Sequence, residues 1–437
     1  MWTRVTRLLN SDWGLYLTRG GVVGTNFFSM LVIAFLMKAD EFGYYALMWA
    51  SAMSLSSVVS VGVPSLLLRE LSAYQVDGYC GISRGHALRL ILVWPAVLLV
   101  AVVGLAAAAG PAILPVFGKP VPALGPTLLA AAAALAINIL NVIAVVYRIL
   151  GHAGMAMALR DAGPQALMLV ATILVAFRGR PEAQTSFAAF LILAFVTVSM
   201  VLVLTRQRLK EQFTRLPKDH AAGRHVIVTG FWGTAVANMV WTQVDILLGG
   251  LVLAPAALGH YQVLKRIANL AAMPQIIANW SAVVQIGRAF AAGDNGRIQA
   301  ECRKTLGLAV FPLLGLLAGT ILAMPLIIRV FDLPPTSGTW IVMIFLLAGS
   351  ATNVLFGLNF LVASQCHLEH HALGTRIVGL VVTALLIAGF GAKGNIPVAI
   401  AYFAGMLAAN VALWAVVRNR LGVDTSVAAI IRKTGQV

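Results

Sequence analysis

The stretch that decides the fold reads TQVDILLGGLVLAPAALGHYQVLKRIANL, residues 242–270. Two apolar runs flank Pro255, yet the runs contain Asp245, Lys265 and Arg266. If each run is a helix, Asp245 lies about 12 Å and Lys265 about 9 Å from the shared turn, at 1.5 Å per residue. The stretch therefore predicts a transmembrane hairpin in which an acid and a base meet at matching depth.

The composition of the whole chain indicates a membrane protein. Of the 437 residues, 60% are hydrophobic and 11% are charged, whereas soluble domains contain about 25% charged residues. The apolar residues gather in runs of about 17–25, the length at which a helix crosses roughly 30 Å of hydrocarbon. A β-barrel would show segments of about ten alternating residues instead. We therefore expect an all-α integral membrane protein.

The apolar runs predict twelve spans, of which the fifth and eleventh are short. Their approximate bounds are 14–37, 42–67, 88–110, 126–147, 162–177, 186–205, 226–253, 259–286, 305–328, 340–364, 377–391 and 398–417.

The basic residues give these spans an orientation. With the N-terminus inside, 22 of the 31 Lys and Arg residues fall in cytoplasmic segments and 6 in outer segments. Cytoplasmic loops of membrane proteins carry this excess of cations, so both termini are expected in the cytoplasm. The net charge of +16 is therefore explained by the basic cytoplasmic loops, and we expect no nucleic-acid partner. Cys80, Cys302 and Cys366 lie on the cytoplasmic side, where thiols stay reduced.

The two halves of the chain repeat each other. EFGYYAL at 41–47 and ALGHYQV at 257–263 are related by an offset of 216 residues. Six spans per half is an even number, so both halves enter the membrane from the same side. Transporters with such parallel repeats commonly place their substrate path between the halves. The predicted organisation is an N-lobe at 1–205, a cytoplasmic linker at 206–225, a C-lobe at 226–417 and a cytoplasmic tail at 418–437.

Two stretches carry a family resemblance. They are FLMKADEFGYYALMWASAMSLSSVVSVGVPSLLLREL at 35–71 and VDILLGGLVLAPAALGHYQVLKRIANLAAMP at 244–274. The sequence resembles the polysaccharide-export, oligosaccharide-flippase branch of the multidrug/oligosaccharidyl-lipid/polysaccharide (MOP) superfamily. In that branch a span ends in a short turn and the next opens with a glycine and a tyrosine.

The resemblance implies both a shape and an activity. The fold would be two six-helix lobes arranged in a V around a central cavity. The activity would be translocation of undecaprenyl-diphosphate-linked oligosaccharide repeat units across the bacterial inner membrane, with a polysaccharide polymerase and glycosyltransferases as prospective partners. Twelve spans leave out the extra pair found in lipid II flippases, which argues against a peptidoglycan precursor as cargo.

The charges inside the predicted spans are the leading candidates for a site, because intramembrane ionisable residues usually have a function and a partner. Asp245 and Lys265 can neutralise each other as a structural ion pair. Adjacent helical residues point about 100° apart, so Asp245 cannot fully serve both bases. Arg266, alone or with Lys265, is then a candidate to bind a lipid diphosphate or an acidic sugar from the central cavity. Asp245 could instead carry a proton or a sodium ion.

Four further residues are candidate substrate contacts. Arg19 either snorkels toward the cytoplasm or contacts a phosphate. Trp49 corresponds to Lys265 at the repeat offset and is a candidate to line the cavity from the other lobe. Asn269 and Gln262 lie seven residues apart on one helical face, where they could bind sugar hydroxyls or join helices by hydrogen bonds.

Other classes of protein fit less well. His367, His370 and His371 match no metal-binding spacing, and neither a phosphate-binding lysine loop nor a catalytic pair is recognisable, so we expect no metal, no cofactor and no enzyme activity. A membrane glycosyltransferase or polymerase would need paired acids or a long outer loop. A cation-coupled multidrug exporter of the same superfamily is the main alternative, but it would favour acidic cavity residues. The energy source stays open between protons, sodium and the glycan gradient.

Overall fold

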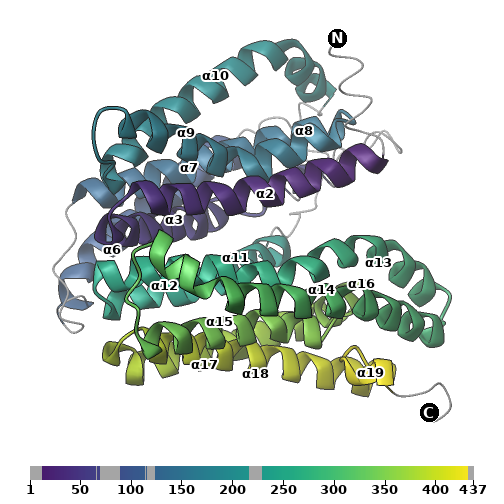
Figure 1. The fold of residues 1–437 in the computed structure, drawn as a ribbon. Coiled ribbons are helices and arrows are strands. Elements are labelled where there is room, and N and C mark those ends of the chain that lie inside the picture. The colour runs from purple at the N-terminus through teal and green to yellow at the C-terminus, as the bar shows by residue number, and fades with distance from the viewer. Residues whose placement is uncertain are drawn as a thin grey trace. The chain divides into compact units, whose positions relative to one another are not determined.

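The computed structural model describes residues 12–64, 66–68, 89–113, 115, 124–215 and 229–431. All regular structure in these residues is helical (Figure 1). The first part contains α2 (Asp12–Leu36), α3 (Ala39–Val59), η1 (Arg89–Val93), α6 (Trp94–Ile113), α7 (Leu124–Ile149), α8 (Ala153–Met157), η3 (Ala158–Ala162), α9 (Gly163–Ala176) and α10 (Ala183–Arg215). The second part contains α11 (Thr229–Val252), α12 (Pro255–Ala268), η4 (Asn269–Ala272), α13 (Met273–Ala291), α14 (Asn295–Val330), α15 (Ser337–Leu355), α16 (Asn359–Gln365), α17 (Glu369–Phe390), η5 (Gly391–Lys393), α18 (Asn395–Leu421) and α19 (Ala428–Ile431).

Ten helical segments of the described residues are long and apolar enough to cross a membrane, so the all-helical membrane class is confirmed. The second and eighth predicted spans are not among the ten. They correspond to α3 and to the run from α12 through α13, which hold equivalent places in the two halves. At 21 residues, α3 is about 31 Å long and could still cross the bilayer. Both runs bury many residues against other helices, so they need less apolar surface than a helix facing lipid.

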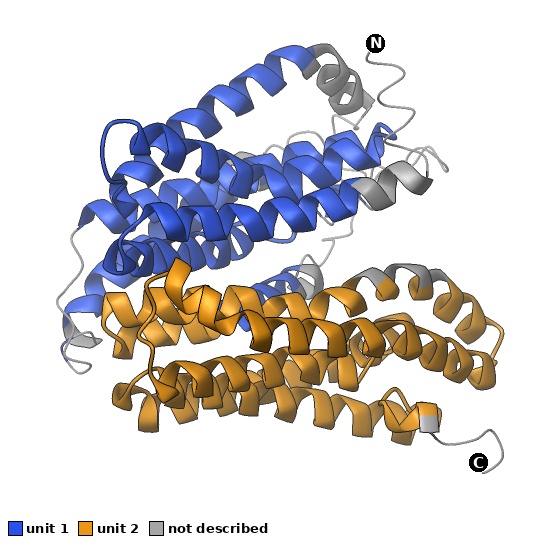
Figure 2. Ribbon diagram, viewed as in Figure 1, with its two compact units in different colours: residues 1–243 blue, residues 244–437 orange. Residues whose placement is uncertain are grey.

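Contacts divide the chain into two compact units, Met1–Gln243 and Val244–Val437 (Figure 2). The boundary falls inside α11. Residues 206–215 of the predicted linker continue α10, and its remainder, 216–225, lies outside the described residues. The predicted lobe bounds at 1–205 and 226–417 stay predictions.

The two units share one packing order. In unit 1, α7 packs against α3, α6 and α10, and α10 packs against α9. In unit 2, α15 takes the place of α7: it packs against α12 with η4, α14 and α18, and α18 packs against α17. A duplicated six-helix precursor would produce this correspondence, in agreement with the sequence repeat.

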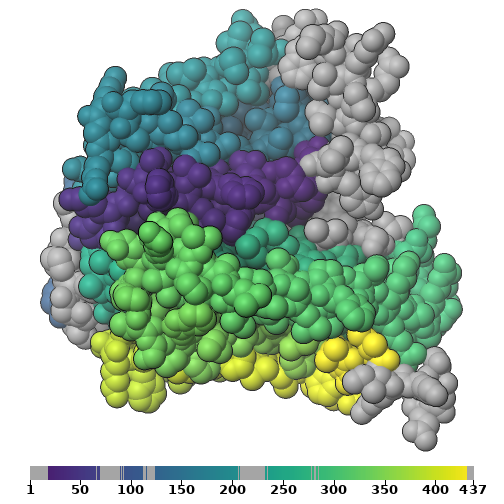
Figure 3. Space-filling model, in the orientation of Figure 1, coloured from purple at the N-terminus to yellow at the C-terminus, as the bar shows by residue number. Residues whose placement is uncertain are grey.

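Several helices carry large apolar side chains that are exposed on the surface of their own unit. On α2, the purple band across Figure 3, Phe28 and Phe35 are 63% and 65% exposed. On α14, Phe311 and Leu322 are 78% and 81% exposed. Such surface is unfavourable in water and favourable against hydrocarbon, as a lipid-facing helix requires.

The predicted tenth span, 340–364, is one helix in the sequence analysis but two in the structure. α15 ends at Leu355 and α16 begins at Asn359, with Gly357 between them at φ +62°. Glycine adopts this left-handed conformation without the steric cost that a Cβ adds. The side chain of Gln275 donates a hydrogen bond to the Gly357 carbonyl. A neighbouring helix therefore satisfies a carbonyl that the break releases.

The chain beyond α18 folds back over this break. Val427 N–H donates to the Leu355 carbonyl at 2.7 Å, and the Thr425 carbonyl lies against Gly357. Asp424 and Gln299 of α14 exchange two hydrogen bonds, of 2.7 and 2.8 Å. We call residues 422–431 the C-terminal strap.

Asp424 anchors the strap through its carboxylate. Its Oδ1 accepts from the Trp414 indole at 2.9 Å and from the Ser426 hydroxyl at 2.7 Å. Partial burial raises the pKa of Asp424, but these bonds, the Ser426 N–H and the charge of Arg418 lower the pKa more, so it lies below its ordinary value. The carboxylate is therefore ionised when it holds the strap.

The close approach at Gly357 makes a stability prediction. Gly357→Ala places a Cβ where the Thr425 carbonyl and the Leu306 side chain already lie, at a positive φ. We expect a loss of about 1–3 kcal/mol or more, measured as a lower melting temperature of the detergent-solubilised protein. Gly319→Ala is the matched control, because its Cβ would meet open space within α14. Equal melting temperatures for the two variants would show that the break tolerates a side chain.

Candidate functional site

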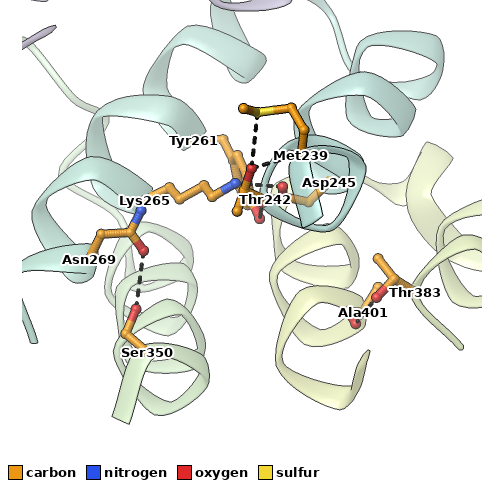
Figure 4. Close-up of polar contacts among 9 residues, drawn as sticks. All are labelled: Met239, Thr242, Asp245, Tyr261, Lys265, Asn269, Ser350, Thr383 and Ala401. Carbon is orange, nitrogen blue, oxygen red and sulfur yellow. Dashed lines mark hydrogen bonds and ion pairs between the residues drawn. The ribbon is translucent and has the colours of Figure 1, made fainter. Parts of the chain in front are cut away.

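The hairpin formed by α11 and α12 brings Asp245 and Lys265 together inside unit 2. Lys265 Nζ lies 2.5 Å from Asp245 Oδ1, and both residues are buried, with relative exposures of 6% and 0%. Pro255 opens α12 one residue after the extended Ala254, so the turn between the helices is short. Figure 4 shows the Lys265 side chain reaching across from α12 to the carboxylate on α11. The predicted acid–base pair is thus present in the structure.

Two tyrosines complete the surroundings of the pair. Tyr261 Oη donates to Asp245 Oδ2 at 2.7 Å, so each carboxylate oxygen receives one donor. Tyr261 precedes Lys265 by four residues, a spacing that places both side chains on one face of α12. Lys265 Nζ also lies 5.4 Å from the centroid of the Tyr402 ring on α18. The i, i+4 spacing could have revealed Tyr261, but no sequence signal links Tyr402 to this pair.

Arg266 follows Lys265 on α12 and points about 100° away from it. Arg266 is partly exposed, whereas Lys265 is buried. From Thr229 to Ala268 the two helices contain one acid, Asp245, and two bases. The hairpin therefore carries an excess of one positive charge.

Asn269 and Gln262 lie on the same helical run but differ in what they contact. Asn269 is the first residue of the 3₁₀ turn η4, and its Oδ1 accepts from the Ser350 hydroxyl at 3.3 Å. Gln262 is 9% exposed, and its Oε1 has no hydrogen-bond partner in the described part of the chain. An unsatisfied buried amide oxygen is costly, which makes Gln262 the better candidate of the two for a ligand hydroxyl.

Arg19 has an acidic partner that the sequence analysis missed. Its Nη1 lies 3.1 Å from Asp161 Oδ2, and Arg160 Nε lies 3.3 Å from the other oxygen. Asn26 of α2 donates to the Asp161 main-chain carbonyl at 2.9 Å. Asp161 lies in the π-helical turn η3, a rare geometry that often marks functional sites. The sequence placed Asp161 just outside the fifth span, and nothing in the pattern predicts a π turn.

Trp49 lies inside unit 1 rather than on an open surface. It is 7% exposed, and its ring packs against Tyr45, Phe187 and Phe190 with centroids 6.0–6.3 Å apart. The structure thus gives Trp49 a packing role, and its contact with a substrate stays a prediction.

The protein resembles known proteins in its fold rather than in its sequence. No family model matches the sequence, and no curated protein matches it. Solved structures do match along nearly the whole chain. The lipid II flippase MurJ in an inward closed conformation is 15% identical with a TM-score of 0.66, covering 92% of this chain and 87% of that one. A MOP superfamily transporter from Pyrococcus furiosus, described as having a binding pocket of reverse polarity, is 16% identical with a TM-score of 0.61, covering 98% and 99%. An inward-facing multidrug resistance MATE family transporter of the MOP superfamily is 14% identical with a TM-score of 0.60, covering 95% of each chain.

The chain has the MOP transporter fold. The matched proteins are transporters, and their fold implies a two-lobe, twelve-span architecture. At sequence identities of 14–16%, these matches establish a shared fold and nothing about the cargo. Both a flippase and multidrug exporters share this MOP fold, so the cargo must be argued from the residues of this chain.

The buried pair makes the second prediction. Asp245→Asn leaves Lys265 buried opposite a neutral amide, which should cost about 3–5 kcal/mol of stability. Tyr261→Phe removes one hydrogen bond to a charged group and should cost about 1.5–3 kcal/mol. Melting temperatures of the purified variants measure both effects.

A double variant separates pairing from simple loss of a side chain. Asp245→Asn with Lys265→Gln removes both charges, so it should be more stable than Asp245→Asn alone. The cycle is completed by Lys265→Gln alone. If the stability loss of the double variant equals the sum of the losses of Asp245→Asn and Lys265→Gln, the ion pair contributes no coupling energy.

Proposed function

We propose that the protein is a flippase for undecaprenyl-diphosphate-linked oligosaccharide repeat units. It moves them from the cytoplasmic to the periplasmic leaflet of a bacterial inner membrane by alternating access, with both termini in the cytoplasm. The MOP fold supports a transporter, and the likeness to the lipid II flippase MurJ supports a lipid-linked cargo. The sequence resemblance to the polysaccharide-export branch supports a sugar cargo.

The observation that carries the proposal is the charge of the α11–α12 hairpin. Asp245 and Lys265 form a pair at 2.5 Å, and Arg266 adds a second base to the same helical turn. A diphosphate presents several anionic oxygens, and a guanidinium binds phosphate oxygens through two parallel hydrogen bonds. In this proposal Arg266 binds the diphosphate, and the Asp245–Lys265 pair holds α12 in the position that presents Arg266.

The sugar part of the cargo needs hydrogen-bonding groups rather than charge. Gln262 has a buried amide oxygen without a partner in the described residues. Asn269 bonds Ser350 only at 3.3 Å, a long contact that a sugar hydroxyl could replace. Arg19 is assigned a second phosphate contact in this proposal, with Asp161 holding its guanidinium in place.

A cation-coupled multidrug exporter is the second candidate, favoured by the likeness to the MATE structures and by the buried carboxylate of Asp245. In that case Asp245 would exchange Lys265 for a proton or a sodium ion during the cycle. A cationic drug would be repelled by the extra base of the hairpin, whereas an anionic lipid headgroup would be attracted. The charge therefore favours the flippase.

Replacing Arg266 tests the proposal. In a host that depends on this protein for its surface glycan, Arg266→Ala should reduce export at least tenfold, because a charge-assisted hydrogen bond contributes about 1.5–3 kcal/mol. Lipid-linked repeat units should accumulate on the inner leaflet, and their amount is measured from radiolabelled sugar in the lipid fraction.

Lys393→Gln is the control, since Lys393 is an exposed base outside the hairpin. Normal glycan export by the Lys265→Gln, Arg266→Gln double variant at normal protein level would exclude a role for these cations. Protein-dependent resistance to cationic drugs, without any effect on the glycan, would establish the exporter instead.

A further inference from the structure

Arg376 of α17 is a charged residue that the proposed transport path does not use. It lies seven residues after α17 begins at Glu369, directly before the apolar run 377–390. Its guanidinium carbon lies 4.3 Å from the centroid of the Phe360 ring, in the first turn of α16. At this distance the cation and the face of the ring attract each other, so Phe360 holds the plane of the guanidinium.

Unlike Lys265 and Arg19, Arg376 has no acidic partner in the described part of the chain. Lys265 pairs with Asp245 and Arg19 pairs with Asp161. No hydrogen bond or ion pair joins Arg376 to another residue in the described part of the chain, and its Nε is buried without an acceptor. Glu369, the acid of α17, lies 3.9 Å from His367 instead. An unpaired, partly buried charge is costly, so an anion from outside the chain would stabilise it.

The position of Arg376 along α17 indicates where that anion lies. Lys393 follows Arg376 by 17 residues, a length of about 26 Å at 1.5 Å per residue. The hydrocarbon core is thicker, at about 30 Å. A short apolar stretch draws the surrounding headgroups toward its flanking cations. Arg376 thus lies at the headgroup level of one leaflet, which the charge distribution assigns to the cytoplasm.

Arg376 is partly exposed, and its neighbours on α17 differ in exposure around the helix. The next residues of α17 expose about half of their side chains: Ile377 49%, Val378 47% and Val381 49%. The opposite face of α17, with Ala372, Gly379 and Thr383, is buried in unit 2. Arg376 shares the packed face with these residues, at i−4, i+3 and i+7, but it is itself partly exposed beside α16, so that a lipid headgroup can reach its guanidinium from the surface of unit 2.

We propose that Arg376, held against Phe360, binds the phosphate of a membrane phospholipid at the seam between α16 and α17. Guanidinium edges donate two parallel hydrogen bonds to phosphate oxygens, and the stacked ring fixes their direction. This site uses other helices than the α11–α12 hairpin and a lipid that is not cargo. The phospholipid site can therefore be present or absent whether or not the proposed transport function is correct.

The test measures how phosphatidylglycerol stabilises the purified full-length protein. Wild type in detergent should gain melting temperature as dioleoyl phosphatidylglycerol is added to the micelles. Arg376→Gln should bind that lipid at least about tenfold more weakly, because it loses charge-assisted hydrogen bonds. Arg418→Gln is the matched control: Arg418 also stacks on an aromatic ring, Trp414, at 5.3 Å, but has Asp424 beside it. It should keep the lipid response.

Three outcomes would overturn or redirect the assignment. An unchanged lipid response in Arg376→Gln excludes the site. Loss of the response in Arg418→Gln to the same extent shows a general surface-charge effect. A shift of wild type by sodium phosphate, against sodium chloride of equal ionic strength and without lipid, assigns the site to soluble phosphate. If Arg376→Gln does not fold, Phe360→Leu serves in its place, and native mass spectrometry should find fewer retained phosphatidylglycerol molecules than in wild type; equal retention excludes the site.

Discussion

An ionised carboxylate inside a membrane must have a partner, and this constraint organises unit 2. Asp245 is fully buried, and water cannot solvate it, so Lys265 and Tyr261 each supply one donor to its oxygens. Both donors come from α12, which fixes the register of α12 against α11. Tyr402 adds the face of its ring to Lys265 and extends the cluster to α18. The charges that appear costly in the sequence thus specify how three helices meet.

The repeat shows how one scaffold can support two different chemistries. At the offset of 216 residues, Ser29, Tyr45 and Trp49 take the places of Asp245, Tyr261 and Lys265. In unit 1 the tyrosine accepts a hydrogen bond from Gln165 at 3.4 Å and stacks on Trp49. An aromatic cluster therefore fills the space that an ion pair fills in unit 2. The packing order of the helices is retained, which shows that the order does not depend on the charges.

The sequence predicted features that depend on local composition and missed those that depend on tertiary contacts. Asp245 and Lys265 could be paired because one short turn joins their helices and the rise per residue gives their depth. The all-helical class followed from the apolar runs in the same way. Asp161 was missed because its contact with Arg19 spans 142 residues. The break at Gly357 was missed because its causes are Gln275 and the strap, which are distant in the sequence.

The composition of α12 has a consequence for how the protein is made. A lysine or an arginine opposes insertion of a helix into the membrane, by about 2.5–3.5 kcal/mol at the helix centre, and α12 contains one of each in its last turn. Released alone from the translocon, α12 would favour water over lipid. The turn at 253–254 is too short to let the two helices enter far apart in time. We therefore expect α11 and α12 to enter as one hairpin, in which the carboxylate of Asp245 offsets the charge of Lys265.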